Sequence, residues 1–183
     1  MFLTEEEILG TSAALNLTCD YFGQNAEMIN AFFAANAQRK FTVMGCGSSY
    51  MLSKSAAAVL ASFPETAANA IPAGDYIADP AFWQDTVRGS IVLMLSRSGR
   101  TSEMVWAARK IKQSLGCPII SINAEADNDI TPMSDLELSM PWCHDNSVCQ
   151  TRTVTNLYAA ALLLAARYAK DDGLWKSVHD AAA

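Results

Sequence analysis

The chain has 183 residues, 51% hydrophobic and 17% charged, which fits one globular domain and is too short for two ordinary ones. Its formal net charge of −6, without a dense run of Lys and Arg, argues against a nucleic-acid surface. The N-terminus, FLTEEEIL, is acidic where a signal peptide is cationic, and no apolar run reaches the roughly 18 residues of a membrane span. We therefore expect a cytoplasmic protein that binds neither nucleic acid nor membrane.

The N-terminal residues 4–38 are predicted to be helical, because Leu, Tyr, Phe and Met recur at helical spacing. Thr4 and Glu7 have the spacing of a capping box, and Gly23 predicts a break into two helices. We expect residues 1–38 to form a helical segment that packs on the domain or on a partner subunit.

Two strand-turn-helix units follow in the next part of the chain. In the first, a strand over 41–44 ends in GCGSS, residues 45–49, which we call the first serine turn. In the second, the apolar run 91–95 ends in SRSGRT, residues 96–101, which we call the second serine turn. Helical periodicity resumes after each turn.

Between the two units we expect an edge strand and a short helix. Residues 68–71 have strand character and are ended by Pro72, and residues 74–76 begin a loop. Trp83 and Val87 belong to a short helix that leads into the second unit.

The serine turns have the chemistry of an anion site. The first N–H groups of a helix lack intrahelical partners, and the helix dipole is positive there. Ser96, Ser98 and Thr101 add hydroxyl donors, and Gly99 permits close backbone approach. The alternative is that a serine-rich turn only caps its own helix.

The last part of the chain predicts strands over 118–122 and 136–140, then an irregular segment over 141–150 that we call the third loop. Residues 153–170 form a helix that is apolar on most faces, which predicts an interface as well as a core. We therefore expect a homodimer or a higher homo-oligomer.

Five strands alternating with helices predict a three-layer αβα fold with a parallel sheet in the flavodoxin-like order 2-1-3-4-5. The serine turns follow the first and third strands, which are neighbours in that order. They should face each other at the switch point, where such sheets bind ligands.

The five cysteines show no C-x-x-C pair, so we expect free, reduced thiols. Cys143, His144, Asp145 and Cys149 are residue types that bind metals, but their spacing matches no zinc module. We expect no metal site.

Three motifs in this order resemble the sugar isomerase (SIS) domain of phosphosugar isomerases and phosphosugar-binding regulators. They are GCGSSY at 45–50, LSRSGRT at 95–101 and SVCQT at 147–151. The third is similar to a loop in the first half of two-domain enzymes such as the isomerase half of glucosamine-6-phosphate synthase and tagatose-6-phosphate ketose/aldose isomerase-like proteins. The resemblance implies a SIS domain over residues 39–172, with residues 173–183 a tail or the start of a linker to a second such domain.

The resemblance also implies roles for residues of this chain. The substrate phosphate would be held by Ser48, Ser49, Ser96, Arg97, Ser98 and Thr101, and the sugar would touch Gly47, Val148 and Gln150. Family members more often have Gln at position 97 and Glu at position 100, so Arg97 and Arg100 make this turn unusually positive. That favours an anionic ligand, and a solvated surface role for each arginine is the alternative.

The implied function is a phosphosugar-binding domain of an aldose/ketose isomerase-type enzyme that acts on a hexose or aminohexose 6-phosphate without a cofactor. In the two-domain enzymes the general base is a Glu of the second half, so a second SIS domain or a dimer mate would complete the site here. Asp145 is the chain's own catalytic candidate, with helix capping as its alternative role. The rival function is a non-catalytic phosphosugar sensor. Such regulators carry a basic helix-turn-helix domain first, and the basic residues before Phe41 are only Arg39 and Lys40.

Overall fold

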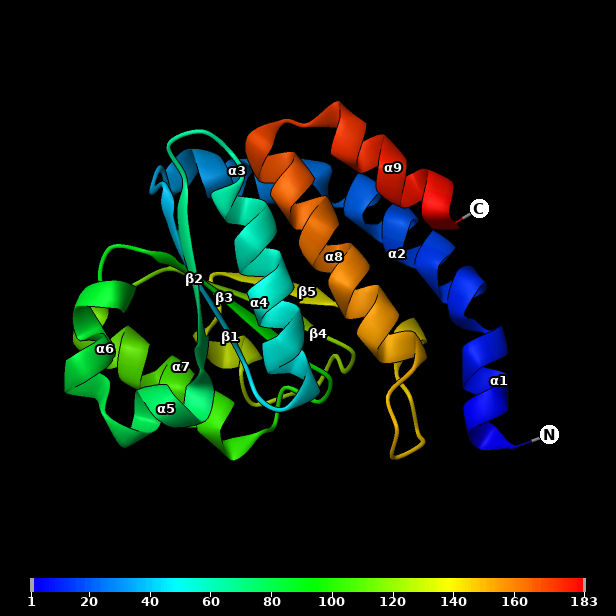
Figure 1. The fold of residues 1–183 in the computed structure, drawn as a ribbon, viewed down its shortest axis with the longest axis horizontal. Coiled ribbons are helices and arrows are strands. Elements are labelled where there is room, and N and C mark those ends of the chain that lie inside the picture. The colour runs from blue at the N-terminus through cyan, green and yellow to red at the C-terminus, as the bar shows by residue number, and fades with distance from the viewer. Residues whose placement is uncertain (1, 183) are drawn as a thin grey trace.

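The computed structural model describes residues 2–182 and contains one parallel sheet of five strands in the order β2-β1-β3-β4-β5 (Figure 1). The strands are β1 (Lys40–Gly45), β2 (Ala67–Pro72), β3 (Ile91–Ser96), β4 (Ile119–Asn123) and β5 (Leu136–Ser139). This arrangement confirms the predicted fold class and strand order. The carboxyl ends of β1 and β3, which carry the two serine turns, therefore lie side by side.

Helices connect and cover the strands. The α-helices are α1 (Leu3–Leu9), α2 (Thr11–Gln24), α3 (Ala26–Ala35), α4 (Ser48–Ala61), α5 (Ala73–Ala78), α6 (Pro80–Val87), α7 (Ser102–Leu115), α8 (Arg152–Ala169) and α9 (Asp172–Ala182). Two short 3-10 helices are η1 (Thr131–Met133) and η2 (Pro141–Cys143). No helix among the described residues is long and apolar enough to cross a membrane.

Two apolar clusters hold the layers together, one on each face of the sheet. Alternate residues of β3 point to opposite faces, as the two-residue period of a strand requires. Leu93 and Leu95 join the cluster beneath α4, α8 and α2, whereas Val92 and Met94 join the cluster beneath α5 and α7. Figure 1 shows α4 and α8 lying across the front face of the sheet. The strand β3 is buried on both faces, which explains its unbroken apolar sequence.

The N-terminal segment differs from the prediction. It forms three helices, with breaks at Gly10 and Asn25, and Gly23 lies inside α2. The predicted capping box of Thr4 and Glu7 is wrong, because α1 already begins at Leu3 and the Phe2 N–H donates to Glu5 Oε2 at 3.3 Å. The side chain of Glu7 is free for a different contact, described below.

Residues 74–76, predicted to begin a loop, lie in helix α5 (Ala73–Ala78) instead. Asp75 lies in the favourable first turn of this helix, and Tyr76 is buried in the cluster between α5 and α7. Burial of one aromatic ring outweighs the local turn signal of Gly74 and Asp75.

Residues 172–182 form helix α9, which packs on α2 and α8. The Ser12 hydroxyl donates to the Ala182 carbonyl at 3.0 Å, and the Arg167 guanidinium lies over the Trp175 ring at 3.8 Å from its centroid. The apolar helix α8 is covered by α2, α3, α4 and α9 of the same chain. The apolar faces of α8 are therefore accounted for within one molecule, and the oligomeric state stays a prediction.

Candidate functional site

The amino ends of α4 and α7 converge at the carboxyl ends of β1 and β3. A small cavity of about 100 Å³ lies between them. It is lined by Cys46, Ser49, Leu95, Ser96, Arg97, Ser98, Thr101, Met104 and Gln150. The two serine turns thus meet in one place, as the strand order predicts, and Gln150 of the third loop lies there as well.

A second, larger groove lies at the other end of the sheet. It measures about 920 Å³ and runs between α3, the end of α8 and the start of α9. None of the motif residues line it. Because ligands of open parallel sheets bind at the carboxyl ends of the strands, the smaller cavity is the candidate site.

The second serine turn is fixed by its own hydrogen bonds. The Ser96 hydroxyl accepts from the Gly99 N–H at 2.9 Å, and the Ser98 hydroxyl accepts from the Arg100 N–H at 3.2 Å. Both bonds stay inside the turn, so neither serine caps the helix α7. The N-cap residue of α7, Thr101, makes no side-chain cap either. The first N–H groups of α7 are therefore available to an anion.

The first serine turn brings α4 close to the sheet. Gly47, with φ +55°, is the N-cap residue of α4, and the N–H groups of Ser49 and Tyr50 donate to the carbonyls of Cys46 and Gly47, each at 3.1 Å. Ser49 is buried and lines the cavity, whereas Gly47 and Ser48 are exposed and are not among the lining residues. Of the three motif residues expected to contact a sugar phosphate here, the geometry places only Ser49 in the cavity.

The third loop contributes Gln150 to the cavity but not Val148. Gln150 lines the cavity, and its Oε1 is buried with no protein partner among the described residues. Val148 is 94% exposed at the tip of the loop. The third loop is tied to the second serine turn, because Arg97 Nη1 donates to the Ser147 carbonyl at 3.1 Å.

The two arginines of the second serine turn have different surroundings. Arg100 forms an ion pair with Glu125 and donates to the Asp127 carbonyl, so a carboxylate compensates its charge. Arg97 lines the cavity and forms no ion pair within residues 2–182. The positive charge that faces the cavity is that of Arg97.

Asp145 occupies a helix-capping position outside the cavity. It is 1% exposed, and its Oδ2 accepts from the backbone N–H groups of Thr151 at 2.6 Å and Thr153 at 2.9 Å. These bonds satisfy N–H groups at the start of α8, which is the alternative role named above. The neighbouring His144 has its Nδ1 3.6 Å from Glu125 Oε1. No group of three His, Cys, Asp or Glu side chains in the described part of the chain is arranged to hold a metal ion.

Sequence reasoning missed the roles of Cys46 and Glu7. Cys46 lines the cavity, and burial raises the pKa of its thiol, which keeps it neutral. Glu7 is 3% exposed and accepts three hydrogen bonds from the third loop. The hydrogen bond from the Ser147 hydroxyl is the main reason that the pKa of Glu7 is lowered. Glu7 is the last of three consecutive glutamates, and nothing in that run predicts that its side chain is buried.

Solved structures of several phosphosugar enzymes share this fold. Tagatose-6-phosphate ketose/aldose isomerase from Escherichia coli matches 99% of this chain and 51% of its own, with a TM-score of 0.84 and 21% identity. The C-terminal domain of glucosamine-fructose-6-phosphate aminotransferase from Francisella tularensis matches 98% of this chain and 52% of its own, with a TM-score of 0.80 and 17% identity. The chain spans about half the length of these proteins.

A shorter protein is similar along nearly its whole length. The structure of a protein from Escherichia coli CFT073, solved in complex with a ligand, matches 96% of this chain and 95% of its own. The TM-score is 0.72 and the sequence identity is 15%. None of the curated proteins compared with the chain is significantly similar to it in sequence. The sequence model of the SIS domain, however, matches residues 35–167, most of the chain and all three motifs, and the chain therefore belongs to the SIS domain family.

Proposed function

We propose that this chain is a phosphosugar-binding domain whose ligand is a hexose or aminohexose 6-phosphate. The observation that carries the proposal is the cavity between the amino ends of α4 and α7. It joins hydroxyl groups of both serine turns with the uncompensated charge of Arg97. The free N–H groups at the start of α7 and the Arg97 guanidinium favour a phosphate dianion over a neutral group. The names of the structural neighbours, which are phosphosugar enzymes, agree with this chemistry.

The size of the cavity suggests how the ligand lies. About 100 Å³ accommodates a phosphate group but not a whole hexose phosphate. With the phosphate against Ser49, Ser98 and Arg97, the open-chain sugar extends out of the cavity toward the third loop. Gln150, whose amide oxygen lacks a protein partner in the described residues, then accepts a hydrogen bond from a sugar hydroxyl.

Hexose 6-phosphates are expected to bind, and the parent sugars are not. Ser98→Ala should weaken the binding of glucosamine 6-phosphate or fructose 6-phosphate by about 1–2 kcal/mol, because it removes a hydroxyl donor to a charged group. Isothermal titration calorimetry measures both effects. Ser177→Ala, on the exposed face of α9, is the matched control and should change nothing. Equal affinity for sugar and sugar phosphate would overturn the proposal.

We further propose that the reaction, where it occurs, is aldose/ketose isomerisation with a base from outside this chain. In the two-domain enzymes that the chain resembles, the general base is a Glu of the second half, and no Asp, Glu or His among the described residues lines the phosphate cavity. General acid-base groups contribute typically about 10²–10⁴ in rate, so the chain alone should bind its ligand and isomerise it poorly. Deuterium exchange at the sugar carbon next to the carbonyl, followed by NMR, measures proton abstraction directly. Robust exchange that Asp145→Asn abolishes with binding intact would show that this chain supplies its own base.

The second candidate function is a non-catalytic phosphosugar sensor, which needs only the hydroxyl groups and the guanidinium that line the cavity and no acid or base. Concentration dependence distinguishes the two functions. If a dimer mate completes an isomerase site, the exchange rate per chain should rise with protein concentration as dimers form. A sensor should bind equally well at every concentration without any exchange. Light scattering on the same samples reports the oligomeric state.

A further inference from the structure

Helix α1 contacts the third loop through one buried carboxylate. Glu7 Oε1 accepts from the backbone N–H groups of Asn146 at 2.7 Å and Ser147 at 3.1 Å. Its Oε2 accepts from the hydroxyl of Ser147. A carboxylate with three donors is a strong local anchor, because bonds to a charged acceptor are about twice as strong as neutral ones.

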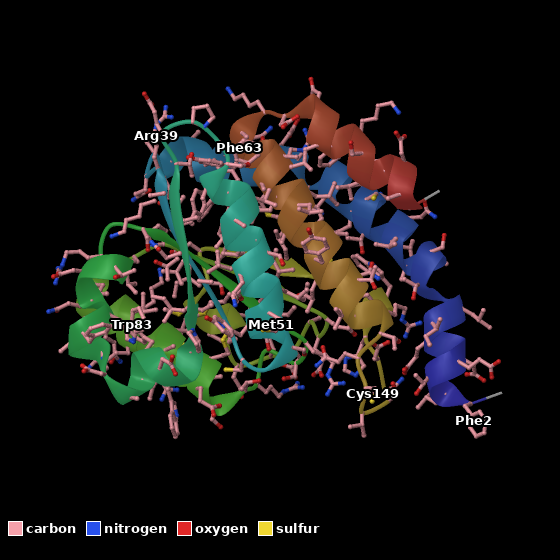
Figure 2. The ribbon with its side chains drawn as sticks, viewed as in Figure 1. Phe2, Arg39, Met51, Phe63, Trp83 and Cys149 are labelled. Atoms are coloured by element: carbon pink, nitrogen blue, oxygen red, sulfur yellow. The ribbon has the colours of Figure 1, made fainter. Side chains whose placement is uncertain are left out.

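The rest of α1 does not explain why this helix lies where it does. Phe2, Leu3, Ile8 and Leu9 all have exposed side chains, and Glu7 is the buried residue of α1. Figure 2 shows Phe2, just before α1, and Cys149, in the third loop, on the same side of the molecule. Among the side chains of α1, the buried contact is therefore the hydrogen bonding of Glu7 to the third loop, not apolar packing.

The same loop segment contacts the candidate site. The carbonyl of Ser147 accepts from Arg97, the guanidinium that lines the cavity. Three residues further on, Gln150 lines the cavity as well. Glu7 thus accepts hydrogen bonds from the N–H and hydroxyl of Ser147, while Arg97 donates to its carbonyl. A shift of Ser147 would therefore move both the Arg97 guanidinium and the Gln150 amide, which face the ligand.

We propose that Glu7 is a positioning residue of the site: it fixes the Ser147 peptide so that Arg97 and Gln150 are pre-organised for the sugar phosphate. The proposal rests on the proposed phosphosugar function. It adds a specific part for the N-terminal helix, a segment whose sequence predicts only packing. Pre-organisation lowers the entropic cost of ordering the loop when the ligand binds.

The test compares three variants of α1 by calorimetry with fructose 6-phosphate. Glu7→Ala removes the acceptor of all three hydrogen bonds and should weaken binding about tenfold or more. Glu7→Gln keeps an oxygen for the two backbone donors, so its affinity should stay within about threefold of wild type. Glu6→Ala removes the same charge from an exposed neighbour on the same helix and should have no effect.

Two further measurements separate positioning from a loss of stability. Amide hydrogen exchange at Asn146 and Ser147 should accelerate in Glu7→Ala but not in Glu6→Ala, with the melting temperature recorded for each. A double-mutant cycle of Glu7→Ala with Arg97→Ala should be non-additive, because both side chains act through Ser147. A variant that only loosened the fold would give additive effects.

The outcomes are distinguishable. If wild type binds neither fructose 6-phosphate nor inorganic phosphate, the proposed function fails, and this proposal fails with it. If wild type binds and Glu7→Ala binds equally well, the proposed function stands and the positioning role is overturned. Faster amide exchange without any loss of affinity also overturns it, since Glu7 would then serve the loop alone.

Discussion

Gly45→Ala is expected to lower the free energy of unfolding by about 3 kcal/mol, the upper part of the range for overpacking a tight site. A Cβ on Gly45 would lie 2.6 Å from both the carbonyl carbon and the oxygen of Ser49, and 2.7 Å from the backbone nitrogen of Tyr50. These are backbone atoms of the first turn of α4, so no side chain can rotate away. The first turn of α4 must therefore shift, and this shift moves Ser49 out of the candidate site.

Thermal unfolding followed by circular dichroism measures this effect. For a chain of this size, a loss of about 3 kcal/mol corresponds to a fall of roughly 6–12 °C in melting temperature. Gly23→Ala in α2 is the matched control, because a Cβ there meets nothing within 4 Å. It should raise stability by about 0.5–1 kcal/mol, the usual gain of Ala over Gly in a helix. Similar melting temperatures for the two variants would contradict the close approach of α4 to β1.

Gly99→Ala is expected to destabilise the protein by about 3 kcal/mol and also to abolish most phosphosugar binding. Gly99 has φ +61°, a left-handed conformation that costs other residues about 1 kcal/mol or more. A Cβ there would also lie 2.7 Å from the Cβ of Asn128. Asn128 cannot retreat freely, because its Oδ1 accepts from the N–H groups of Ile130 and Thr131, each at 3.1 Å. The second serine turn must therefore distort.

Gly89→Ala separates backbone strain from the steric contact. Gly89 has φ +68°, close to that of Gly99, but a Cβ on it would meet nothing within 4 Å. We expect this control to cost about 1 kcal/mol and to leave ligand binding intact. The difference between the two variants measures the contact with Asn128. Equal melting temperatures and equal affinities for Gly99→Ala and Gly89→Ala would contradict this prediction. They would show that packing against Asn128 does not fix the conformation of the second serine turn.

The fold could be predicted because its signals are local and repeated. The strand β3 shows six consecutive buried residues ending in a serine turn, and α7 shows an apolar stripe that ends at the left-handed Gly116. Alternation of such units leaves few topologies for a parallel sheet. The switch point then follows from the strand order, which is why Ser49 and the second serine turn could be expected in one place.

The prediction failed where burial overrode a local pattern. Gly74 and Asp75 carry a turn signal, yet the segment is helix α5 because Tyr76 is buried under α7. Thr4 and Glu7 have capping-box spacing, yet Glu7 contacts the third loop, which is distant in sequence. A short motif reflects only interactions between residues that are close in sequence. Its prediction fails when a segment distant in sequence offers a more stable contact.

The sequence by itself therefore determined the layers, the strand order and the hydroxyl groups at the edge of β1 and β3. The tertiary structure decided which polar side chains act there. Arg97 faces the cavity, whereas Arg100 does not line it and forms an ion pair with Glu125. Glu7 meets Asn146 across 139 residues of chain, a partnership that no local periodicity encodes. Charges and hydrogen bonds depend on positions within a few ångströms, and only the folded packing of distant segments sets those positions.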